Sequence, residues 1–139
     1  MTFQLTEPIL LIGLGGVGVS LAEKAKKSLN SDCLMISHDQ KDLTAENSIK
    51  ISTKSVVNPS THLIRGSTLE TSDEIKKNIA NYSTVILISN LAGKAGAGIG
   101  PIVSRICKQE QKNLLSFAIM PFKFEKERIF QSGIALKRI

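Results

Sequence analysis

The chain has 139 residues and a mass of 15.1 kDa, the size of a single domain, which we place at residues 1–139. Its 42% hydrophobic and 22% charged residues exclude an intrinsically disordered or collagen-like chain. The net charge of +6 is carried partly by lysine pairs at helical positions. We expect these pairs to lie on solvated helix surfaces, so we do not expect a nucleic acid partner. No apolar run reaches the roughly 18–20 residues of a membrane span, and two cysteines in apolar runs fit a reducing, cytoplasmic setting.

The first half of the chain alternates apolar runs with amphipathic segments. Pro8–Ile12 is a short continuous apolar run that predicts a strand buried on both faces. Gly18–Leu29 has apolar residues at helical spacing and predicts an amphipathic helix. Cys33–Ile36 predicts a second strand. An irregular stretch is expected over Ser37–Arg65, with a possible edge strand at Ile49–Thr53.

The second half repeats this alternation. Ser72 has the chemistry of an N-cap, and the helix it opens is expected to end near Asn81. Thr84–Ile88 is β-branched and uninterrupted, so it predicts the strongest strand. Pro101 is expected to start a helix that ends near Gln109, because proline suits a first helical turn. A strand at Leu114–Met120 and a helix after it complete the pattern. The sequence therefore predicts a three-layer, Rossmann-like α/β fold with a mostly parallel sheet and helices on both faces.

A first glycine segment follows the first predicted strand and opens the first predicted helix. We expect Gly13 to turn the chain sharply off the strand. Gly15 and Gly16 remove Cβ atoms, so that backbone N–H groups can approach a phosphate, and Gly18 lets the helix pack close to the sheet. A helix N-terminus adds unpaired N–H groups and partial positive charge. This arrangement predicts a nucleotide site, with a ligand-free glycine turn as the alternative.

A second glycine segment, from Ala92 to Pro101, again joins a strand to a helix. Two such segments at neighbouring strand ends would hold two parts of one polyphosphate. Lys94 either adds positive charge there or points into solvent. Glycines this dense are entropically costly in a mere connector, so we favour a binding role over a linker.

One acidic residue supports a different interpretation. Asp39 lies past the second strand, about 20 residues after the last glycine of the first segment, where a dinucleotide-binding fold places its ribose-binding acid. A solvated loop position is equally compatible with the sequence. His38 and His62 have no partner at metal-ligand spacing, and we expect both at the surface.

A third motif, from Met120 to Glu125, completes a resemblance to a known family. Together the three motifs resemble the nucleotide-binding domain of the tubulin/FtsZ superfamily, most closely FtsZ. The family's Gly-Gly-Gly-Thr-Gly-Thr-Gly run followed by Ala-Ala-Pro is similar to the frame Ala92–Pro101. Its Pro-Phe-x-Phe-Glu segment matches Pro121–Glu125 residue for residue. The resemblance covers almost the whole chain and corresponds to the N-terminal half of an FtsZ.

The resemblance implies GTP or GDP as the ligand, with or without Mg²⁺, and a cytoskeletal or cell-division context. It implies that Gly15, Gly16, Gly96 and Gly98 contact phosphates and that Glu125 lies at the ribose. The complete nucleotide-binding set that we predict is Gly13, Gly15, Gly16, Gly18, Ser20, Ala92, Gly93, Lys94, Ala95, Gly96, Ala97, Gly98, Glu125 and Arg128. No residue is predicted to be catalytic and none to bind a metal directly.

Several positions depart from the family pattern. Ala95 and Ala97 replace the two threonines, and Lys94 replaces the third glycine. Ser20 stands for the family's asparagine. A glycine-rich loop expected near Arg65–Ser72 holds only Gly66. The family's central helix, acidic hydrolysis loop and C-terminal domain are not in this chain, so we expect little hydrolysis by the chain alone.

The leading hypothesis is therefore a guanine-nucleotide-binding domain, in a divergent family member or a fragment, that acts in regulation or filament assembly. Its expected partners are the nucleotide and either a second copy or an FtsZ-like filament protein. Two alternatives stay open. One is an NAD(P)-binding domain of an oxidoreductase, which Asp39 supports. The other is a degenerate module that binds no nucleotide and acts only through protein contacts, which the replaced threonines allow.

Overall fold

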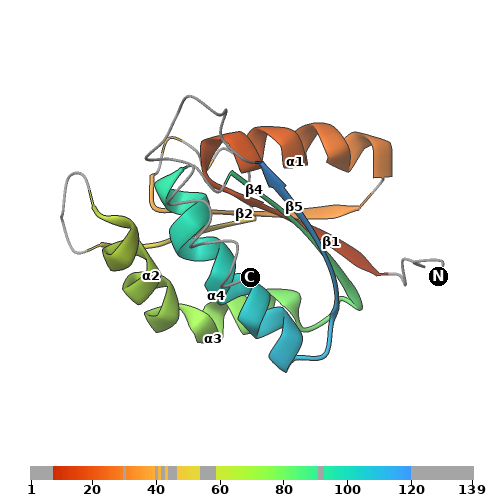
Figure 1. Cartoon of the computed structure of the whole chain (residues 1–139). Helices are drawn as coiled ribbons and strands as arrows, with labels where there is room; N and C mark the ends of the chain where they lie inside the picture. The colour runs from red at the N-terminus through yellow and green to blue at the C-terminus, as the bar shows by residue number, and fades with distance from the viewer. Residues whose placement is uncertain are drawn as a thin grey trace.

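Five parallel strands form the centre of the molecule (Figure 1). The computed structural model describes residues 8–29, 31–39, 41, 43, 47–53, 59–90 and 93–119. The strand order is β3-β2-β1-β4-β5, and every neighbouring pair is parallel. The strands are β1 (Ile9–Leu14), β2 (Asp32–Ser37), β3 (Ser48–Lys50), β4 (Thr84–Asn90) and β5 (Asn113–Ile119). The predicted parallel sheet is confirmed, and so is the edge position of the strand near Ile49.

Helices cover both faces of this sheet, as the sequence predicts. Helix α1 (Gly15–Leu29) lies on one face, and α2 (Thr61–Glu70), α3 (Ser72–Ile79) and α4 (Lys94–Gln109) lie on the other (Figure 1). Two clusters of buried side chains fill the spaces between the three layers. The smaller one joins Val19 and Ala22 of α1 to Leu11 of β1. The larger one joins Ile12 of β1 to residues of the other helices, such as Ile75.

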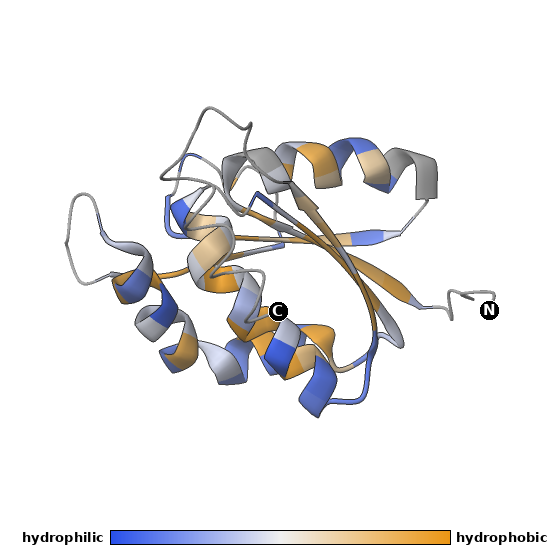
Figure 2. Ribbon diagram, viewed as in Figure 1, coloured by the Kyte–Doolittle hydropathy of each residue, from blue (hydrophilic) through white to orange (hydrophobic). Residues whose placement is uncertain are grey.

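The continuous apolar runs form the central strands because helices cover both of their faces. From Leu10 to Leu14 every residue of β1 is buried, and so is every residue of β4 from Thr84 to Ser89. Figure 2 shows this as strands of almost uniform hydrophobic colour between helices with polar outer surfaces. Both cysteines are free and buried, Cys33 in β2 and Cys107 in α4.

Helix α2 is absent from the sequence prediction, which placed an irregular stretch up to Arg65 and a glycine-poor loop at Arg65–Ser72. The structure corrects both expectations. The buried residues of α2 are Ile64, Ser67 and Thr68, so it has no wide apolar stripe to reveal it. Its polar face is tolerated because the Thr68 hydroxyl donates to the Ile64 carbonyl at 2.7 Å.

The predicted N-cap is also displaced. Ser60 caps α2, because its hydroxyl accepts a hydrogen bond from the Leu63 amide at 3.2 Å. Ser72 lies inside α3, and its hydroxyl donates to the Leu69 carbonyl at 2.6 Å. Only Thr71 separates α2 from α3, so the Ser72 side chain bonds backward to the preceding helix. Asp73, by contrast, lies in the first turn of α3.

Helix α4 begins earlier than the sequence predicts, at Lys94, so Pro101 lies inside it. The predicted glycine loop is therefore mostly the first two turns of a helix. Glycine has a low intrinsic helix propensity. Here close packing of α4 against β4 and α2 outweighs that low propensity and stabilises the helix. The helix predicted after residue 124 lies outside the described residues, and so does the segment Pro121–Glu125.

Candidate anion-binding site at the carboxyl edge of the sheet

The chain turns from β1 into α1 at Gly15, which has φ of +71°. L-residues with a side chain rarely adopt this conformation, so Gly15 supplies the turn that we predicted for Gly13. Gly13 is instead a strand residue, paired with Met35 on one side and Ile88 on the other. The prediction for Gly13 is wrong because β1 extends two residues further than its apolar run.

Gly13 is required for a different reason, which it shares with Gly18. A Cβ on Gly13 would lie 2.6 Å from the Gly18 carbonyl oxygen, and a Cβ on Gly18 would lie 2.5 Å from the Ile88 carbonyl oxygen. Real Cβ atoms essentially never approach backbone this closely. The predicted role of Gly18 in bringing the helix close to the sheet is therefore confirmed. Gly13 contributes the strand side of the same close contact, because β1 has no side chain at the point where Gly18 of α1 packs against it.

The two glycine segments meet at the carboxyl edge of the sheet. A Cβ on Gly15 would lie 2.9 Å from the Ala95 Cβ and 3.9 Å from the Gly96 amide nitrogen. The strand register explains this proximity, because Leu14 pairs with Ser89 of β4, whose chain leads directly into α4. Two helix starts that are far apart in sequence are therefore adjacent in space.

The N-cap residue of α4 has no side chain that could cap the backbone amides at the start of the helix. Its N-cap is Gly93, whose amide donates to the Asn90 carbonyl at 3.1 Å and whose carbonyl accepts from the Ala97 amide at 3.0 Å. The amides of Ala95 and Gly96 precede this first intrahelical bond and belong to the group that helix geometry leaves without helical partners. Neither α4 nor α1 has an acidic residue in its first turn. Both helix starts therefore suit an anion.

Gly96 holds this helix start against β4. A Cβ on Gly96 would lie 2.8 Å from the Asn90 carbonyl carbon and closer still to its oxygen. Gly98 has a different surrounding, since its Cβ would lie 3.0 Å from Ile64 Cγ2 and 3.0 Å from the Thr61 carbonyl oxygen of α2. Gly98 thus faces a neighbouring helix, where we predicted a phosphate contact.

The remaining predicted site residues are distributed as follows. Gly16 and Ser20 of α1 and Lys94 of α4 are exposed, whereas Ala95 and Ala97 are buried. Ala92, Glu125 and Arg128 lie outside the described residues, so their predicted roles stay predictions. The structure brings Gly15, Ala95 and Gly96 together directly.

The end of β2 contributes a third segment to the same edge. Leu14 of β1 pairs with Ile36 of β2, so the residues that follow Ile36 run beside the glycine turn. Ser37 is buried, and its hydroxyl accepts from the Asp39 amide at 3.1 Å. The Asp39 carboxylate in turn accepts from the Lys41 amide at 3.0 Å. Asp39 is exposed, consistent with the loop interpretation of its sequence.

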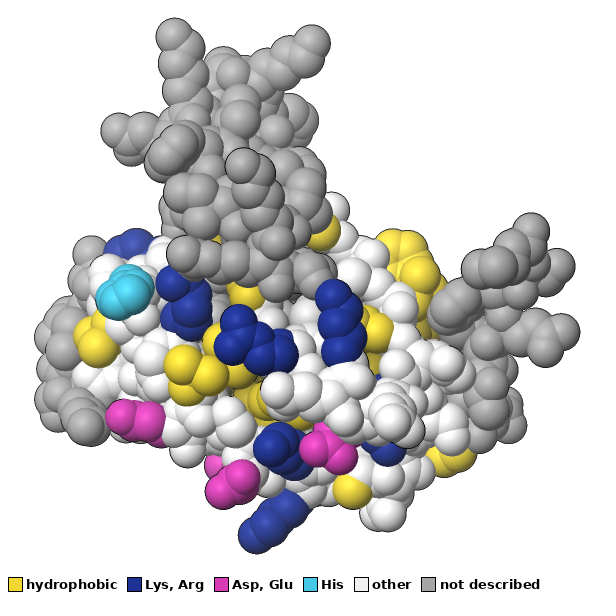
Figure 3. Space-filling model, turned by 60° about the horizontal axis from the view of Figure 1, so that its bottom comes forward, with side chains coloured by type: hydrophobic (Ala, Val, Ile, Leu, Met, Phe, Trp, Pro, Cys, Tyr) yellow, Lys and Arg dark blue, Asp and Glu magenta, His cyan; other side chains and the backbone are white. Residues whose placement is uncertain are grey.

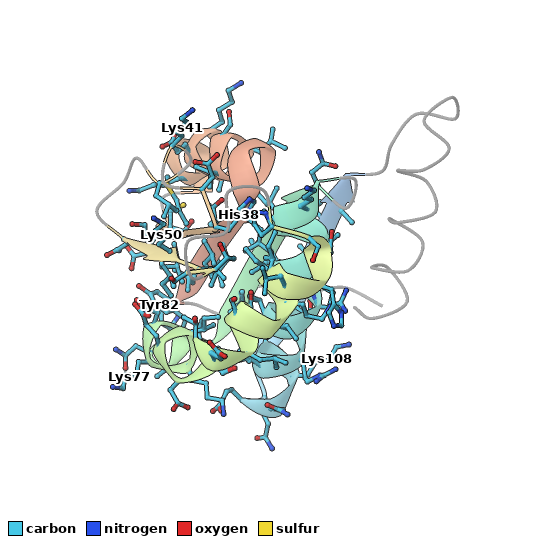
Figure 4. The ribbon with its side chains drawn as sticks, turned by 90° about the vertical axis from the view of Figure 1, so that its left-hand side faces the viewer. His38, Lys41, Lys50, Lys77, Tyr82 and Lys108 are labelled. Carbon is cyan, nitrogen blue, oxygen red and sulfur yellow. The ribbon has the colours of Figure 1, made fainter. Side chains whose placement is uncertain are left out.

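His38 departs from the predicted surface position, whereas His62 is exposed as expected. The His38 side chain is half-buried, and its Nδ1 atom is buried without a hydrogen-bond partner among the described residues. Figure 4 looks onto the carboxyl edge and places His38 near its middle, between α1 and α4. Sequence patterns give no signal for this placement, because it depends on which strands are neighbours.

The thiols are unsuited to nucleophilic chemistry. Burial raises the pKa of Cys33, and it raises the pKa of Cys107 to about 11, so both thiols stay protonated near neutral pH. Within the described ranges no group of three or more His, Cys, Asp or Glu residues is arranged to hold a metal ion.

Charged side chains are dispersed over the face of the molecule that α2, α3 and α4 form. Figure 3 shows that the Lys and Arg side chains on this face are interrupted by hydrophobic and uncharged surface and are accompanied by acidic side chains. Such a face resembles an ordinary solvated helix surface more than a continuous basic stripe. None of the helices in the described part of the chain is long and apolar enough to cross a membrane.

Comparison with known proteins identifies the class. Residues 8–139 match the family described as Tubulin/FtsZ family, GTPase domain. The match covers most of the chain, so this protein belongs to the tubulin/FtsZ family and represents its GTPase domain. The fold and the resemblance predicted from the sequence are thereby confirmed. No curated protein matches the sequence.

Solved structures show the same fold. An FtsZ dimer of M. jannaschii superposes with a TM-score of 0.84 at 24% identity over 94% of this chain and 41% of that chain. CetZ from Methanosaeta thermophila gives 0.76 at 16% identity over 94% and 42%. The phage tubulin PhuZ, solved with GDP, gives 0.79 at 16% identity over 94% and 42%. The chain thus spans about two fifths of the length of these proteins.

Proposed function

We propose that this domain binds GTP and GDP, with the phosphates resting on the backbone amides at the starts of α1 and α4. The observation that carries the proposal is the contact between Gly15 and the Ala95–Gly96 segment, which joins two helix starts into one cradle. Each start lacks an acidic residue in its first turn. The summed partial charges of two helix N-termini favour a polyphosphate over a single carboxylate.

The family match supports guanine nucleotide over a dinucleotide cofactor. The tubulin/FtsZ GTPase domain is a guanine-nucleotide domain, and its phage relative PhuZ has been solved with GDP. The NAD(P) hypothesis rested on Asp39, whose carboxylate is engaged by the Lys41 amide. Mg²⁺ would accompany the nucleotide through its phosphates, because magnesium usually keeps several waters and few protein ligands.

A titration with fluorescent GTP, GDP and NADH tests this assignment. Saturable binding of GTP and GDP without binding of NADH would support it. Binding of NADH alone would favour the dinucleotide hypothesis, and binding of none of them would favour the pure interaction module.

A matched pair of variants tests the location of the ligand. Lys94→Glu places a negative charge at the start of α4, and Lys108→Glu makes the same change of net charge in its last turn. Both side chains are exposed. We expect Lys94→Glu to weaken GTP binding roughly tenfold at low salt and Lys108→Glu to change it less than twofold. Equal effects would show that only net charge matters and would contradict the proposed location.

We further propose a regulatory or filament-related role with little hydrolysis by this chain alone. The phage relative PhuZ has been solved as a filament, and the TubZ of bacteriophage PhiKZ as a protofilament. Sedimentation with GTP, alone and with a filament-forming FtsZ, tests assembly, and phosphate release tests hydrolysis. Release at the rate of an assembled FtsZ would contradict the expected low hydrolysis.

A further inference from the structure

The two edge strands of the sheet differ in how they are protected against pairing with another strand. At one edge, β3 has only three residues and ends at the exposed Lys50, and both features block the addition of a strand. At the other edge, β5 has seven residues, none of them charged and none of them proline. Among the strands that the structure describes, β5 pairs with β4 alone. Its outer row of backbone N–H and C=O groups therefore suits a further strand.

The side chains of β5 are also incompletely covered. Leu115 packs against the buried cluster beneath α1, so the alternation of side chains along a strand places Phe117 on the same face. Phe117 is 54% exposed, whereas its register partner in β4, Ile88, is 7% exposed. The cover that α1 provides thus ends at β4. Strands of a parallel sheet are normally covered on both faces, so β5 presents an apolar surface for another molecule.

The sequence of β5 is compatible with pairing to a second copy of itself. Two identical strands related by a two-fold axis perpendicular to the sheet run antiparallel, and the same face of each lies on the same side. We place the axis at Ser116, the middle residue of β5. Leu115 then lies opposite Phe117 of the second copy, and Leu114 lies opposite Ala118 of the second copy. Apolar cross-strand pairs stabilise a sheet, and an uncharged strand meets no like charge when it pairs with itself.

We propose that two copies of this chain associate through β5, so that their two sheets join into one across a two-fold axis at Ser116. The interface lies along the side of the sheet, whereas the candidate phosphate cradle lies at the carboxyl ends of β1 and β4. The inference therefore goes beyond the proposed nucleotide function and does not depend on it. A single strand pair is a small interface, so we expect a dissociation constant of roughly 1–100 μM.

Sedimentation velocity of the wild-type chain without nucleotide tests the association. We expect the sedimenting mass to rise with concentration from 15.1 kDa toward twice that value and not beyond it, because a two-fold contact closes on itself. A chain that remains monomeric up to about 0.5 mM overturns the proposal. A mass that keeps rising past that of a dimer also overturns it, since such growth indicates non-specific association of apolar surfaces.

A matched pair of lysine variants locates the contact. Phe117→Lys places a charge on the proposed edge, which is how natural edge strands block pairing. Leu69→Lys makes the same change of charge on α2, where Leu69 is 50% exposed. Both side chains are exposed, so both variants should keep the wild-type fold, which circular dichroism checks. We expect Phe117→Lys to weaken dimerisation at least about tenfold and Leu69→Lys to change it less than about twofold. Equal weakening by both variants overturns the assignment to β5.

Cysteine cross-linking tests the register independently of these variants. Two Ser116 Cα atoms opposite each other on antiparallel strands would be about 4.5–5.5 Å apart, a separation that a disulfide spans. In the same register the Cα atoms of two Asn113 residues would be roughly 20 Å apart. Ser116 and Asn113 are both exposed, whereas the native Cys33 and Cys107 are buried. Mild oxidation should therefore convert Ser116→Cys into a covalent dimer and leave Asn113→Cys monomeric.

The remaining outcomes separate this inference from the proposed function. Cross-linking of neither cysteine variant, or of Asn113→Cys as readily as Ser116→Cys, overturns the two-fold pairing of β5. A chain that binds GTP but stays monomeric overturns the dimer and leaves the nucleotide function standing. A dimer through β5 that binds no guanine nucleotide supports this inference and overturns the proposed function.

Discussion

The helix starts of this protein are built in two different ways. Helix α2 begins at a side-chain cap, Ser60, and α3 has Asp73 and Glu74 in its first turn, so both complete their own N-termini with polar or acidic side chains. Helix α1 begins at Gly15 and α4 follows a glycine N-cap, Gly93, and neither helix has an acidic residue in its first turn. The first pair needs no ligand. The partial positive charge at the starts of α1 and α4 is not balanced by an acidic side chain of the first turn, so an external anion can balance it. These two helix starts are also the ones in contact with each other.

The largest expected effect on stability is at Gly96, which packs the start of α4 against β4. A methyl group there would collide with the Asn90 backbone, so Gly96→Ala should lower the free energy of unfolding by more than about 3 kcal/mol. Gly66→Ala is the matched control, because its Cβ would meet nothing within 4 Å. That helical glycine should gain roughly 0.5–1 kcal/mol on becoming alanine. Urea unfolding measures both, and equal effects would contradict the packing role of Gly96.

Gly15 should show the next largest effect. Gly15→Ala imposes a side chain on a φ of +71° and brings a methyl group onto Ala95, so we expect a loss of about 1–3 kcal/mol. The same change in an Ala95→Gly background removes the contact and leaves the backbone strain. A double-mutant cycle by urea unfolding separates the two. If the two substitutions are additive, Gly15 and Ala95 are not in contact and the cradle is wrong.

The capped helices provide a smaller effect. Ser60→Ala should cost about 1 kcal/mol, because the Leu63 amide loses its acceptor. Ser72→Ala removes an exposed bond to the Leu69 carbonyl and should cost less than about 0.5 kcal/mol. Neither variant should alter GTP affinity. A larger loss for Ser72→Ala in thermal unfolding would restore Ser72 as the cap that the sequence suggested.

The smallest effect lies at the amino edge of the sheet. The Tyr82 hydroxyl donates to the Asp32 carboxylate at 2.6 Å, and this hydrogen bond is the main cause that raises the pKa of Tyr82 to about 12. Because the folded-state pKa is above the ordinary value of 10, the stabilisation is complete below pH 10 and is lost as pH rises toward 12. Tyr82→Phe should therefore be slightly less stable than wild type at pH 8 and equally stable near pH 12. A stability difference that grows with pH would contradict this assignment.

Much of the architecture follows from the sequence because the informative patterns are strong. The uninterrupted apolar runs of β1, β2 and β4 and the glycine turn before α1 predict a parallel sheet with its carboxyl edge available for a ligand. The sequence predictions that failed did so for physical reasons. Helix α2 buries Ser67 and Thr68 in place of apolar residues, and α4 forms through glycines whose helical state depends on tertiary contact with β4 and α2.

The candidate site was predicted less completely than the fold. The glycine pattern and the family resemblance placed Gly15 and Gly96 at the candidate site, where their phosphate contacts stay predictions. The turn was assigned to Gly13 instead of Gly15, since the end of β1 is set by pairing with β2 and β4. Gly98 has the same spacing as a phosphate-contacting glycine, yet it faces Ile64 of α2. His38 gave no signal, because its relation to Gly15 comes from strand order. Which glycines pack and which bind is a property of neighbours, which a linear motif does not contain.

Changes in amide NMR shifts on addition of GDP show where the phosphates lie. We expect the largest changes on Gly15, Gly16 and residues 94–96, with the amides of α3 nearly unchanged. Saturable GDP binding with its largest changes elsewhere, or no change at either glycine segment, would contradict a phosphate cradle made by the starts of α1 and α4.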